Sequence, residues 1–379
     1  MTRPVCPDTA LLSKSCDACI SCETCFTACC TFEATGNPES TPMNRLAIIH
    51  RLLSGEAVLE EDIRNIYTCT ECGRCDTVCP MEIPISETIA EGKVPMVAMG
   101  FGPLPRHNDM IAAIFAKGNA VNKDAATRLD WLPAEERPLA PLERPCDTLL
   151  YMGCMASWVD KATARACYFL LKKAGVAFTL MEDEFCCGIY PYNAGKREEA
   201  RSIFTSMQKK FAELGISRII VPCAGCHRTF STYYPRMLTD FTIQTVHISE
   251  FLLTLIEEKR LTFTPVSRTI TFHDSCKLGR KSGIYEAPRK LLQHMGYRLK
   301  ELPENRENSR CCGAGAGVRS FAADLSMDIS QQLLADIHET LLVTTCPFCI
   351  FNLGYTAKKK GQNLHISHIA SLACEQLAP

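Results

Sequence analysis

Cysteine is the residue type whose number and spacing in this sequence could do chemistry. The chain of 379 residues contains 24 cysteines. Disulfides are rare in the reducing cytosol, and a chain of this length does not need covalent cross-links to fold, so a disulfide-rich secreted protein is a poor fit. Thiolates are also ligands for zinc and for iron–sulfur clusters, and their spacing distinguishes the two. We therefore interpret most of these cysteines as metal ligands.

Two short runs have the spacing of [4Fe–4S] ligands. Cys69, Cys72, Cys75 and Cys79 precede Pro80 in the pattern of bacterial ferredoxins, and an earlier run repeats the spacing. In this pattern the first three thiolates hold one cubane and the fourth reaches the other. We therefore predict two cubane clusters, the first held by Cys19, Cys22, Cys25 and Cys79, and the second by Cys69, Cys72, Cys75 and Cys29.

The first run departs from the pattern in two ways. Cys30 stands where the pattern has proline, and Cys16 lies three residues before Cys19. A frame that begins at Cys16 is conceivable, but only the later frame supplies the three-residue gap before the last ligand. We therefore expect Cys16 and Cys30 to be spare buried thiols near the clusters.

Two sets of five cysteines repeat one pattern in the rest of the chain: a single Cys, a Cys-Cys-Gly and a Cys-x-x-Cys. A zinc site and a cubane each take four ligands, so five cysteines with two adjacent fit neither. Two adjacent cysteines favour either one bridging thiolate or two ligands aimed at neighbouring irons, and the glycines that follow let backbone N–H groups approach the cluster. The alternative is a pair of zinc sites, each with a spare thiol. The first set is Cys154, Cys186, Cys187, Cys223 and Cys226, and the second is Cys276, Cys311, Cys312, Cys346 and Cys349.

The elements that must position these sets also occur twice. Short β-branched runs precede Cys154, Cys223, Cys276 and Cys346, and amphipathic stretches at 194–214 and 321–338 alternate with them. This alternation predicts an α/β domain with a largely parallel sheet, built twice. Because ligands gather at the carboxyl ends of parallel strands, the two sets should face each other across a pseudo-two-fold axis. The repeat extends to VHISEFL from Val246 and LHISHIASL from Leu364.

The expected fold class is α+β multidomain. Apolar residues on one face of 43–53 predict a helix between the two N-terminal runs, which favours an all-helical ferredoxin arrangement. Prolines punctuate the stretch that follows, with one helix near 108–117. We predict a helical ferredoxin domain at 1–95, a linker at 96–145, and α/β domains at 146–262 and 263–379.

The two ferredoxin runs and the two complete five-cysteine sets resemble the D-type subunit of heterodisulfide reductase and, more broadly, the family with a duplicated CCG domain. The resemblance implies a non-cubane [4Fe–4S] cluster in each set, so that all ten cysteines are catalytic. It implies reduction of the disulfide of coenzyme M and coenzyme B in methanogens, with electrons relayed by the two cubanes. The implied partner is an electron-donor subunit, either a b-type cytochrome or a flavoprotein.

Three alternatives stay open. Similar subunits relay electrons from flavin dehydrogenases for glycolate, lactate or glycerol 3-phosphate to a quinone. A relative in sulfate reducers acts on a protein-bound trisulfide. A zinc-bound scaffold is the alternative without redox chemistry. Complete sets favour catalysis over relay.

Several charged residues near the cysteines are candidates for substrate binding or proton donation. An anionic substrate needs basic groups, and Lys277, Arg280 and Lys281 are the best candidates, although each basic residue alone could be a solvated surface charge. The other basic candidates are His227, Arg228, His273 and Arg319. The candidate proton donors, which helix caps or solvated faces would also explain, are Asp160, Asp274, Glu182 and Glu184.

The overall charge and hydropathy give a simpler expectation. The formal net charge is −1, which gives no reason to expect nucleic acid or an anionic membrane as the main partner. Met1–Leu12 has no signal segment and no long apolar run follows, so we expect a cytoplasmic protein that associates with a membrane only through a partner. Four cysteines match no ligand spacing, namely Cys6, Cys146, Cys167 and Cys374.

Overall fold

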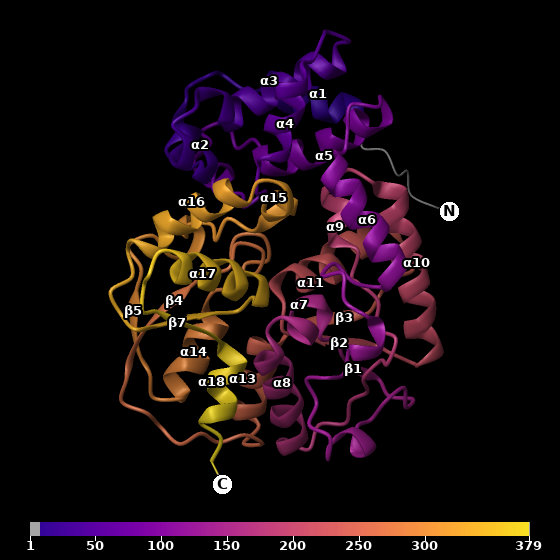
Figure 1. The fold of residues 1–379 in the computed structure, drawn as a ribbon, viewed down its shortest axis with the longest axis vertical. Coiled ribbons are helices and arrows are strands. Elements are labelled where there is room, and N and C mark those ends of the chain that lie inside the picture. The colour runs from indigo at the N-terminus through magenta and orange to yellow at the C-terminus, as the bar shows by residue number, and fades with distance from the viewer. Residues whose placement is uncertain (1–7, 379) are drawn as a thin grey trace.

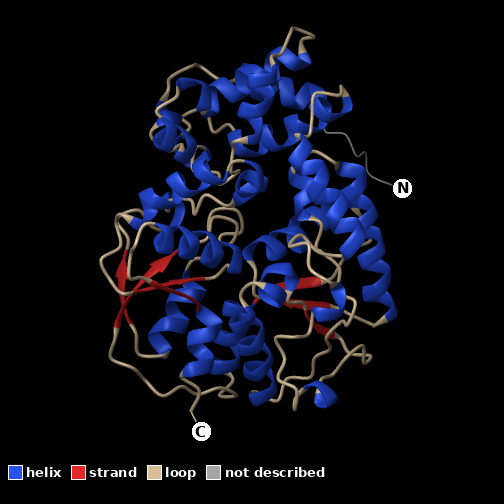
Figure 2. Cartoon of the chain, in the orientation of Figure 1, coloured by secondary structure: helices blue, strands red, loops and turns tan. Residues whose placement is uncertain are grey.

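The computed structural model describes residues 8–378 and consists of a helical N-terminal domain above two α/β halves that lie side by side (Figure 1). Each half contains a small sheet surrounded by helices (Figure 2). The α+β multidomain prediction is confirmed. Cys6 lies outside the described residues. None of the helices within residues 8–378 is both long enough and apolar enough to span a membrane.

The N-terminal domain is built on the helix predicted between the two cysteine runs. Pro42 opens this helix, and the Thr41 hydroxyl caps it by accepting from the Asn44 N–H at 3.2 Å. Its apolar face, which includes Leu46 and Ile49, is buried against the first and fifth helices. The helices are α1 (Thr9–Asp17), α2 (Cys30–Thr35), α3 (Pro42–Leu53), α4 (Glu60–Tyr67) and α5 (Ile85–Ala98).

The segment predicted as a linker packs closely against both neighbours. Helix α5 continues through residue 95 to Ala98, and α6 (Pro105–Lys117) follows it. Farther along, the fully buried Trp131 lies edge-on to Tyr168 of the first α/β half. This segment is therefore ordered by contacts rather than extended between domains.

The first half contains a three-stranded parallel sheet in the order β1-β2-β3. Its strands are β1 (Thr148–Leu150), β2 (Arg218–Val221) and β3 (Gln244–His247). Its helices are α7 (Gly153–Trp158), α8 (Lys161–Lys173), α9 (Ile189–Asn193), α10 (Arg197–Glu213), α11 (Ala224–Arg228), α12 (Tyr234–Met237) and α13 (Ile248–Glu257).

The second half contains a four-stranded parallel sheet in the order β5-β4-β6-β7. Its strands are β4 (Thr269–His273), β5 (Arg298–Glu301), β6 (Leu341–Thr344) and β7 (His365–His368). Its helices are α14 (Glu286–His294), α15 (Val318–Phe321), α16 (Ala323–Leu334), α17 (Pro347–Lys359) and α18 (Ile369–Glu375).

The two sheets are copies of one arrangement. Strands β1, β2 and β3 correspond to β4, β6 and β7, while the counterpart of β5 is reduced to a single parallel bridge between Leu149 and Thr179. The sequence alignment of the two tails was wrong by three residues. His247 ends β3 and pairs with Val221, and its counterpart is His368, which ends β7 and pairs with Thr344. The shared letters HIS had instead placed His247 opposite His365. That match was misleading because His365 begins β7, whereas His247 and His368 each end a strand.

The halves are joined by an apolar core between their outer helices. Leu170 of α8 and Leu372 of α18 are buried there, together with Leu252 of α13 and Leu291 of α14. Burying a leucine side chain contributes roughly 1.5–3 kcal/mol, so this core holds the halves in a fixed relation.

Candidate metal centre

Two small hollows in the N-terminal domain collect the predicted cubane ligands. One is lined by Cys19, Cys22, Cys25 and Cys79, and the other by Cys29, Cys69, Cys72 and Cys75. The fourth cysteine of each run thus lies with the first three of the other run. The first hollow is at the surface, where Cys22 is exposed and Ile20 is 60% exposed. The second hollow is buried.

Arg45 is the charged residue beside the second hollow. Its side chain is buried, donates from Nη1 to Cys29 Sγ at 3.8 Å, and is held by the Asn65 carbonyl and the Thr68 hydroxyl. Burial opposes the charge of Arg45, but the thiolates of Cys69 and Cys29 raise its pKa above the ordinary value. A permanent positive charge at this place favours the more reduced, more negative state of a bound cluster.

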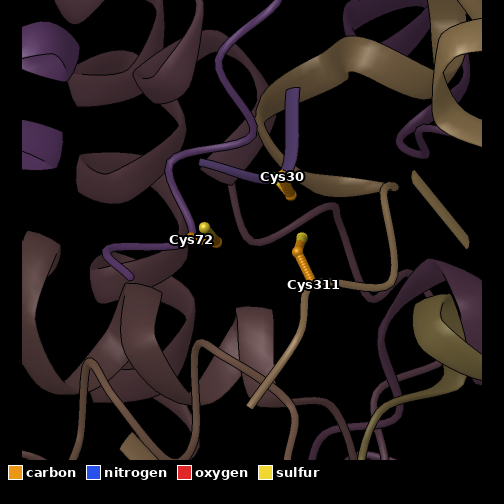
Figure 3. A group of neighbouring side chains, drawn as sticks. All are labelled: Cys30, Cys72 and Cys311. Carbon is orange, nitrogen blue, oxygen red and sulfur yellow. The ribbon is translucent and has the colours of Figure 1, made fainter. Parts of the chain in front are cut away.

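The two cysteines that the sequence left spare differ from each other. Cys16 packs in the apolar core of the N-terminal domain, and burial raises its pKa to about 11. The expectation for Cys30 was incomplete, because its sulfur belongs to a buried group with Cys72 and Cys311 in which all sulfurs lie within 4.8 Å of one another (Figure 3). Cys30 therefore connects a ferredoxin run to the second five-cysteine set.

Each five-cysteine set comes together at the carboxyl ends of its strands. Cys154 and Cys223 follow β1 and β2, and Cys276 and Cys346 follow β4 and β6. Within each set, successive sulfurs lie within hydrogen-bonding distance, and Cys223 of the first set reaches Cys346 of the second. The order of neighbours is Cys154, Cys186, Cys187, Cys226 and Cys223 in the first set, and Cys276, Cys311, Cys312, Cys349 and Cys346 in the second.

The chemistry of these groups fits iron–sulfur ligation. The cysteines within residues 8–378 are free thiols. Hydrogen bonds from Cys311 and Cys349 lower the pKa of Cys312 to about 6, whereas those from Cys312 and Cys346, with burial, raise the pKa of Cys349 well above its ordinary value, so these close sulfurs share protons. Thiolates are the metal-binding form of cysteine. Backbone N–H groups also point at sulfur, as from Gly313 to Cys311 at 3.3 Å, which is the kind of contact that tunes a cluster.

Buried carboxylates hold the turns that carry the first cysteine of each set. Glu184 accepts from the backbone N–H groups of Met152 and Gly153, each at 2.9 Å, and pairs with Arg128 at 2.6 Å. In the second half, Asp274 accepts from both terminal nitrogens of Arg289 at 2.8 and 2.7 Å. These contacts occupy both carboxylates.

These contacts favour a structural role for Glu184 and Asp274 over the proton donation that the sequence also allowed, while burial raises the pKa of Glu184 above its ordinary value. The other two candidates lie at the surface or at a helix end. Glu182 is exposed, and Asp160 accepts from the Thr163 hydroxyl at 2.5 Å at the start of α8.

One cavity of about 560 Å³ lies between the two sets. Its wall also contains apolar side chains, among them Val121, Ile189 and Phe348, and basic side chains of Arg106, Lys123, Lys277 and Arg319. The cysteines in its wall are Cys154, Cys186, Cys187, Cys223, Cys226, Cys276, Cys312, Cys346 and Cys349. Both sets thus face a common space of ligand size.

Of the basic candidates for substrate binding, two lie in the cavity wall, and Arg280 and Lys281 do not. Lys277 and Arg319 line the cavity. Arg280 instead donates from Nε to the Cys72 carbonyl at 2.9 Å, and Lys281 pairs with Asp76 at 2.9 Å. Both side chains fasten the Cys276 loop to the N-terminal domain. Of the described residues, His227, Arg228 and His273 also lie outside the cavity wall.

Lys277 both lines the cavity and helps to fasten the Cys276 loop to the N-terminal domain. It is buried and lies 3.6 Å from the Glu71 carboxylate, which also pairs with Lys93 at 2.8 Å. Burial alone would raise the pKa of Glu71, but Lys93 and Lys277 hold it below the ordinary value. This buried charge cluster joins α5, the Cys69–Cys72 loop and the Cys276 loop.

Two histidines lie at the junction of the halves. The Nδ1 atoms of His247 and His368 accept from the backbone N–H groups of Ser249 and Ala370, at 3.2 and 3.1 Å, so the proton of each ring is on Nε2. His247 Nε2 donates to the Thr345 carbonyl at 3.1 Å, and His368 Nε2 donates to the Pro222 carbonyl at 2.9 Å. Burial, followed by the charges of His227 and His368, lowers the pKa of His247 to about 3. Each half therefore holds the residue that precedes a Cys-x-x-Cys of the other.

Sequence reasoning missed Arg45, Arg106, Lys123 and the two junction histidines. Arg45 was visible as a basic residue beside the apolar face of α3, and both histidines lie in the repeated HIS segments, whereas no local pattern marks Arg106 or Lys123. Their roles come from contacts between segments far apart in the chain.

Comparison with known proteins agrees with this arrangement. Residues 148–231 and 270–354 match the family described as a cysteine-rich domain (CCG), and residues 15–83 match a 4Fe-4S dicluster domain. The chain is 31% identical to the D-type subunit of dihydromethanophenazine:CoB–CoM heterodisulfide reductase from Methanosarcina barkeri, and 32% identical to that from Methanosarcina mazei. Each alignment covers 97% of this chain and 96% of the relative.

The name of a more distant relative gives a different activity. The chain is 30% identical to an EtfAB:quinone oxidoreductase of Syntrophomonas wolfei, over 75% of this chain and 42% of that protein. Three features agree on one family: the two shared domains, the complete cysteine sets and the end-to-end similarity to the Methanosarcina proteins. The chain belongs to the iron–sulfur family that includes the D-type subunit of heterodisulfide reductase, with its duplicated cysteine-rich CCG domain.

Proposed function

We propose that this chain is the catalytic iron–sulfur subunit of a reductase that splits a small disulfide into two thiols. The reaction consumes two electrons and two protons, RSSR′ + 2 e⁻ + 2 H⁺ giving RSH + R′SH. The names of the Methanosarcina relatives support the disulfide of coenzyme M and coenzyme B as the substrate. The observation that carries the proposal is a shared cavity of about 560 Å³ whose wall contains cysteines of both sets.

The cofactors follow from the ligand groups. We assign a cubane [4Fe–4S] cluster to each N-terminal hollow, and a non-cubane [4Fe–4S] cluster to each five-cysteine set. When bound, these clusters supply electrons one at a time, which is why a two-electron reaction suits a cavity with two of them. The ten cysteines of the sets ligate iron and do not attack the substrate, which separates this chemistry from thiol–disulfide exchange.

Residues of the cavity wall orient the substrate and limit its contact with water. Arg319 lies 4.4 Å above the Tyr355 ring and donates to the Ala323 carbonyl at 3.3 Å, so its guanidinium is held at the wall. A fixed guanidinium is suited to a carboxylate, sulfonate or phosphate group of the substrate. Phe348 and Val121 supply apolar surface for the chain that carries the sulfur.

The positions of the sulfurs support an order in which the sites would pass electrons. Cys311 of the second set is beside Cys72 of the second hollow, whereas the first set reaches the N-terminal domain through the Cys223–Cys346 contact. We infer that electrons from the partner protein enter at the exposed first hollow, pass the buried second hollow and reach the second set before the first.

The test is a pair of ligand variants compared with a matched cysteine variant. In the protein purified anaerobically, Cys187→Ala and Cys312→Ala should each abolish disulfide reduction while the N-terminal cubane signals remain in electron paramagnetic resonance spectra. Cys146→Ala, which removes a partly exposed thiol outside both sets, should retain activity. Disulfide reduction at wild-type rates in either ligand variant would contradict the proposal.

The second candidate function is an electron relay to a quinone, favoured by the likeness to the EtfAB:quinone oxidoreductase. A relay should show normal cubane signals but no new paramagnetic species when the oxidised protein is mixed with the product thiols. A disulfide reductase should show such a species. The same spectra therefore separate the two functions.

A further inference from the structure

Three sulfurs meet at the contact between the N-terminal domain and the second half. Cys30 begins α2, Cys72 lies in the second ferredoxin run, and Cys311 belongs to the second set (Figure 3). Their exposed fractions are 5%, 8% and 1%. The ligand assignments above use Cys72 and Cys311 but leave Cys30 without a role.

A hydroxyl group joins this contact. Thr70 is 1% exposed, and its Oγ1 lies 3.5 Å from the sulfur of Cys30 and 3.5 Å from the sulfur of Cys311. The Cys30 sulfur in turn lies within hydrogen-bonding distance of Cys72 and Cys311. Buried polar groups take their hydrogen-bond partners from their immediate surroundings, and for this hydroxyl and this thiol those surroundings are sulfur atoms.

The local backbone is built for this close approach. Gly315 of the second half packs against the carbonyl of Thr70, where a side chain would collide with the backbone. The Arg280 guanidinium fastens the Cys72 carbonyl from the other side at 2.9 Å. The hydroxyl and the thiol are therefore held in place from both domains.

We propose that Thr70 and Cys30 form a hydrogen-bonding bridge that sets the reduction potentials on the two sides of this contact. The Cys30 thiol and the Thr70 hydroxyl donate to the ligand sulfurs of Cys72 and Cys311. Donors to a ligand sulfur stabilise the reduced, more negative state of a cluster and raise its potential. The proposal rests on the cluster assignments of the proposed function and adds two positioning residues to it.

The residue type at position 30 agrees with a role as a donor, since a cysteine that does not ligate a cluster keeps an S–H group. Proline, the usual residue at this position of the ferredoxin pattern, has no hydrogen to donate to a sulfur.

The chain offers closely matched substitutions for a test. Thr70→Val removes the hydroxyl without changing the shape of the side chain, and Thr70→Ser keeps the hydroxyl. Cys30→Pro restores the usual ferredoxin residue at the first position of a helix, where proline is well tolerated. Cys167→Ala is the control, since Cys167 is a buried thiol of α8 outside every ligand group.

The experiment is an anaerobic titration with dithionite of the complete protein, followed by electron paramagnetic resonance, with iron content measured on each sample. Thr70→Val and Cys30→Pro each remove a hydrogen bond to a ligand sulfur. We expect each variant to make the equilibrium constant for reduction of the cluster held by that sulfur about tenfold less favourable. For a one-electron couple this corresponds to a potential about 59 mV lower. Thr70→Ser and Cys167→Ala should keep the wild-type potentials, and the signal of the first set should not move in any variant.

The outcomes separate this bridge from the function on which it rests. Wild-type protein without iron in the five-cysteine sets would defeat the proposed function before any variant is compared. Fully loaded Thr70→Val and Cys30→Pro proteins with unmoved potentials would overturn only the bridge. Loss of iron from both Thr70 variants would also overturn it, because the residue would then serve packing rather than hydrogen bonding.

Discussion

The Glu184–Arg128 pair is the feature whose removal should separate a structural role from a catalytic one. Both side chains are nearly inaccessible, with exposed fractions of 4% and 3%, and their charged atoms are 2.6 Å apart. Glu184→Gln keeps the shape of the side chain but leaves Arg128 as an uncompensated buried charge. Breaking a buried pair in this way costs about 3–5 kcal/mol.

The magnitude can be checked with a double-mutant cycle. Glu184→Gln should lower the thermal midpoint of the reconstituted protein by roughly 10 °C, since a domain of this size loses about 2–4 °C for each kcal/mol. Glu184→Gln combined with Arg128→Met removes both charges, so it should be more stable than the single variant by about 1–3 kcal/mol. Burial opposes the charge of Arg128, but Glu184 raises its pKa above the ordinary value, which is why Arg128 stays charged in the wild-type protein.

The spectroscopic consequence is confined to one set. Glu184 holds the N–H groups of Met152 and Gly153 immediately before Cys154, so Glu184→Gln should weaken the signal of the first set only. Asp274→Asn, which breaks the corresponding pair with Arg289, should weaken the second set only. A Glu184→Gln protein with wild-type stability and full cluster signals, but a slowed proton-dependent step, would refute the structural role and restore Glu184 as a proton donor.

Three further outcomes follow from the site. Arg319→Gln should raise KM for an anionic disulfide about tenfold, while Arg280→Gln should leave KM unchanged. Steady-state kinetics of the two variants would show which of the two arginines binds the substrate. His107 is buried, and its pKa is lowered to about 4 by burial and then by Lys93. As pH falls, the unfolded state therefore binds this proton first, and stability should fall by about 1.4 kcal/mol for each pH unit from about 6.5 down to 4, a contribution to the slope that should be missing when His107→Gln is denatured beside the wild-type protein. His247→Gln should loosen the Thr345 and Pro222 carbonyls, which precede Cys346 and Cys223, and broaden the signals of both sets, and unchanged spectra would remove the histidine from that role.

The parts of this protein that sequence could predict are those that local spacing determines. The ferredoxin runs, the repeated sets and the strands that precede Cys154 and Cys276 depend on residues within a few positions of one another, and all were found. Helix α3 followed from the apolar periodicity of Leu46 and Ile49 in the same way.

The parts that sequence could not predict depend on contacts between distant segments. A basic cluster next to Cys276 fits an anion channel as well as a domain contact, and only the tertiary fold shows Arg280 against the Cys72 carbonyl. The same limit applies to Cys30, whose neighbours are 42 and 281 positions away in the numbering of the chain. It applies to Arg106 of α6, which reaches the cavity from a segment that looks like a linker.

The crossed histidine contacts have a consequence for how a substrate can enter. A clamshell motion that parts the two halves would have to break the bonds of His247 and His368 to the opposite carbonyls, and would expose the apolar core between α8 and α18. The two halves are therefore held together around the cavity, and a substrate has to reach it without parting them. A cavity held in this way selects by size, so bulky disulfides, such as those on folded proteins, are excluded instead of being accommodated.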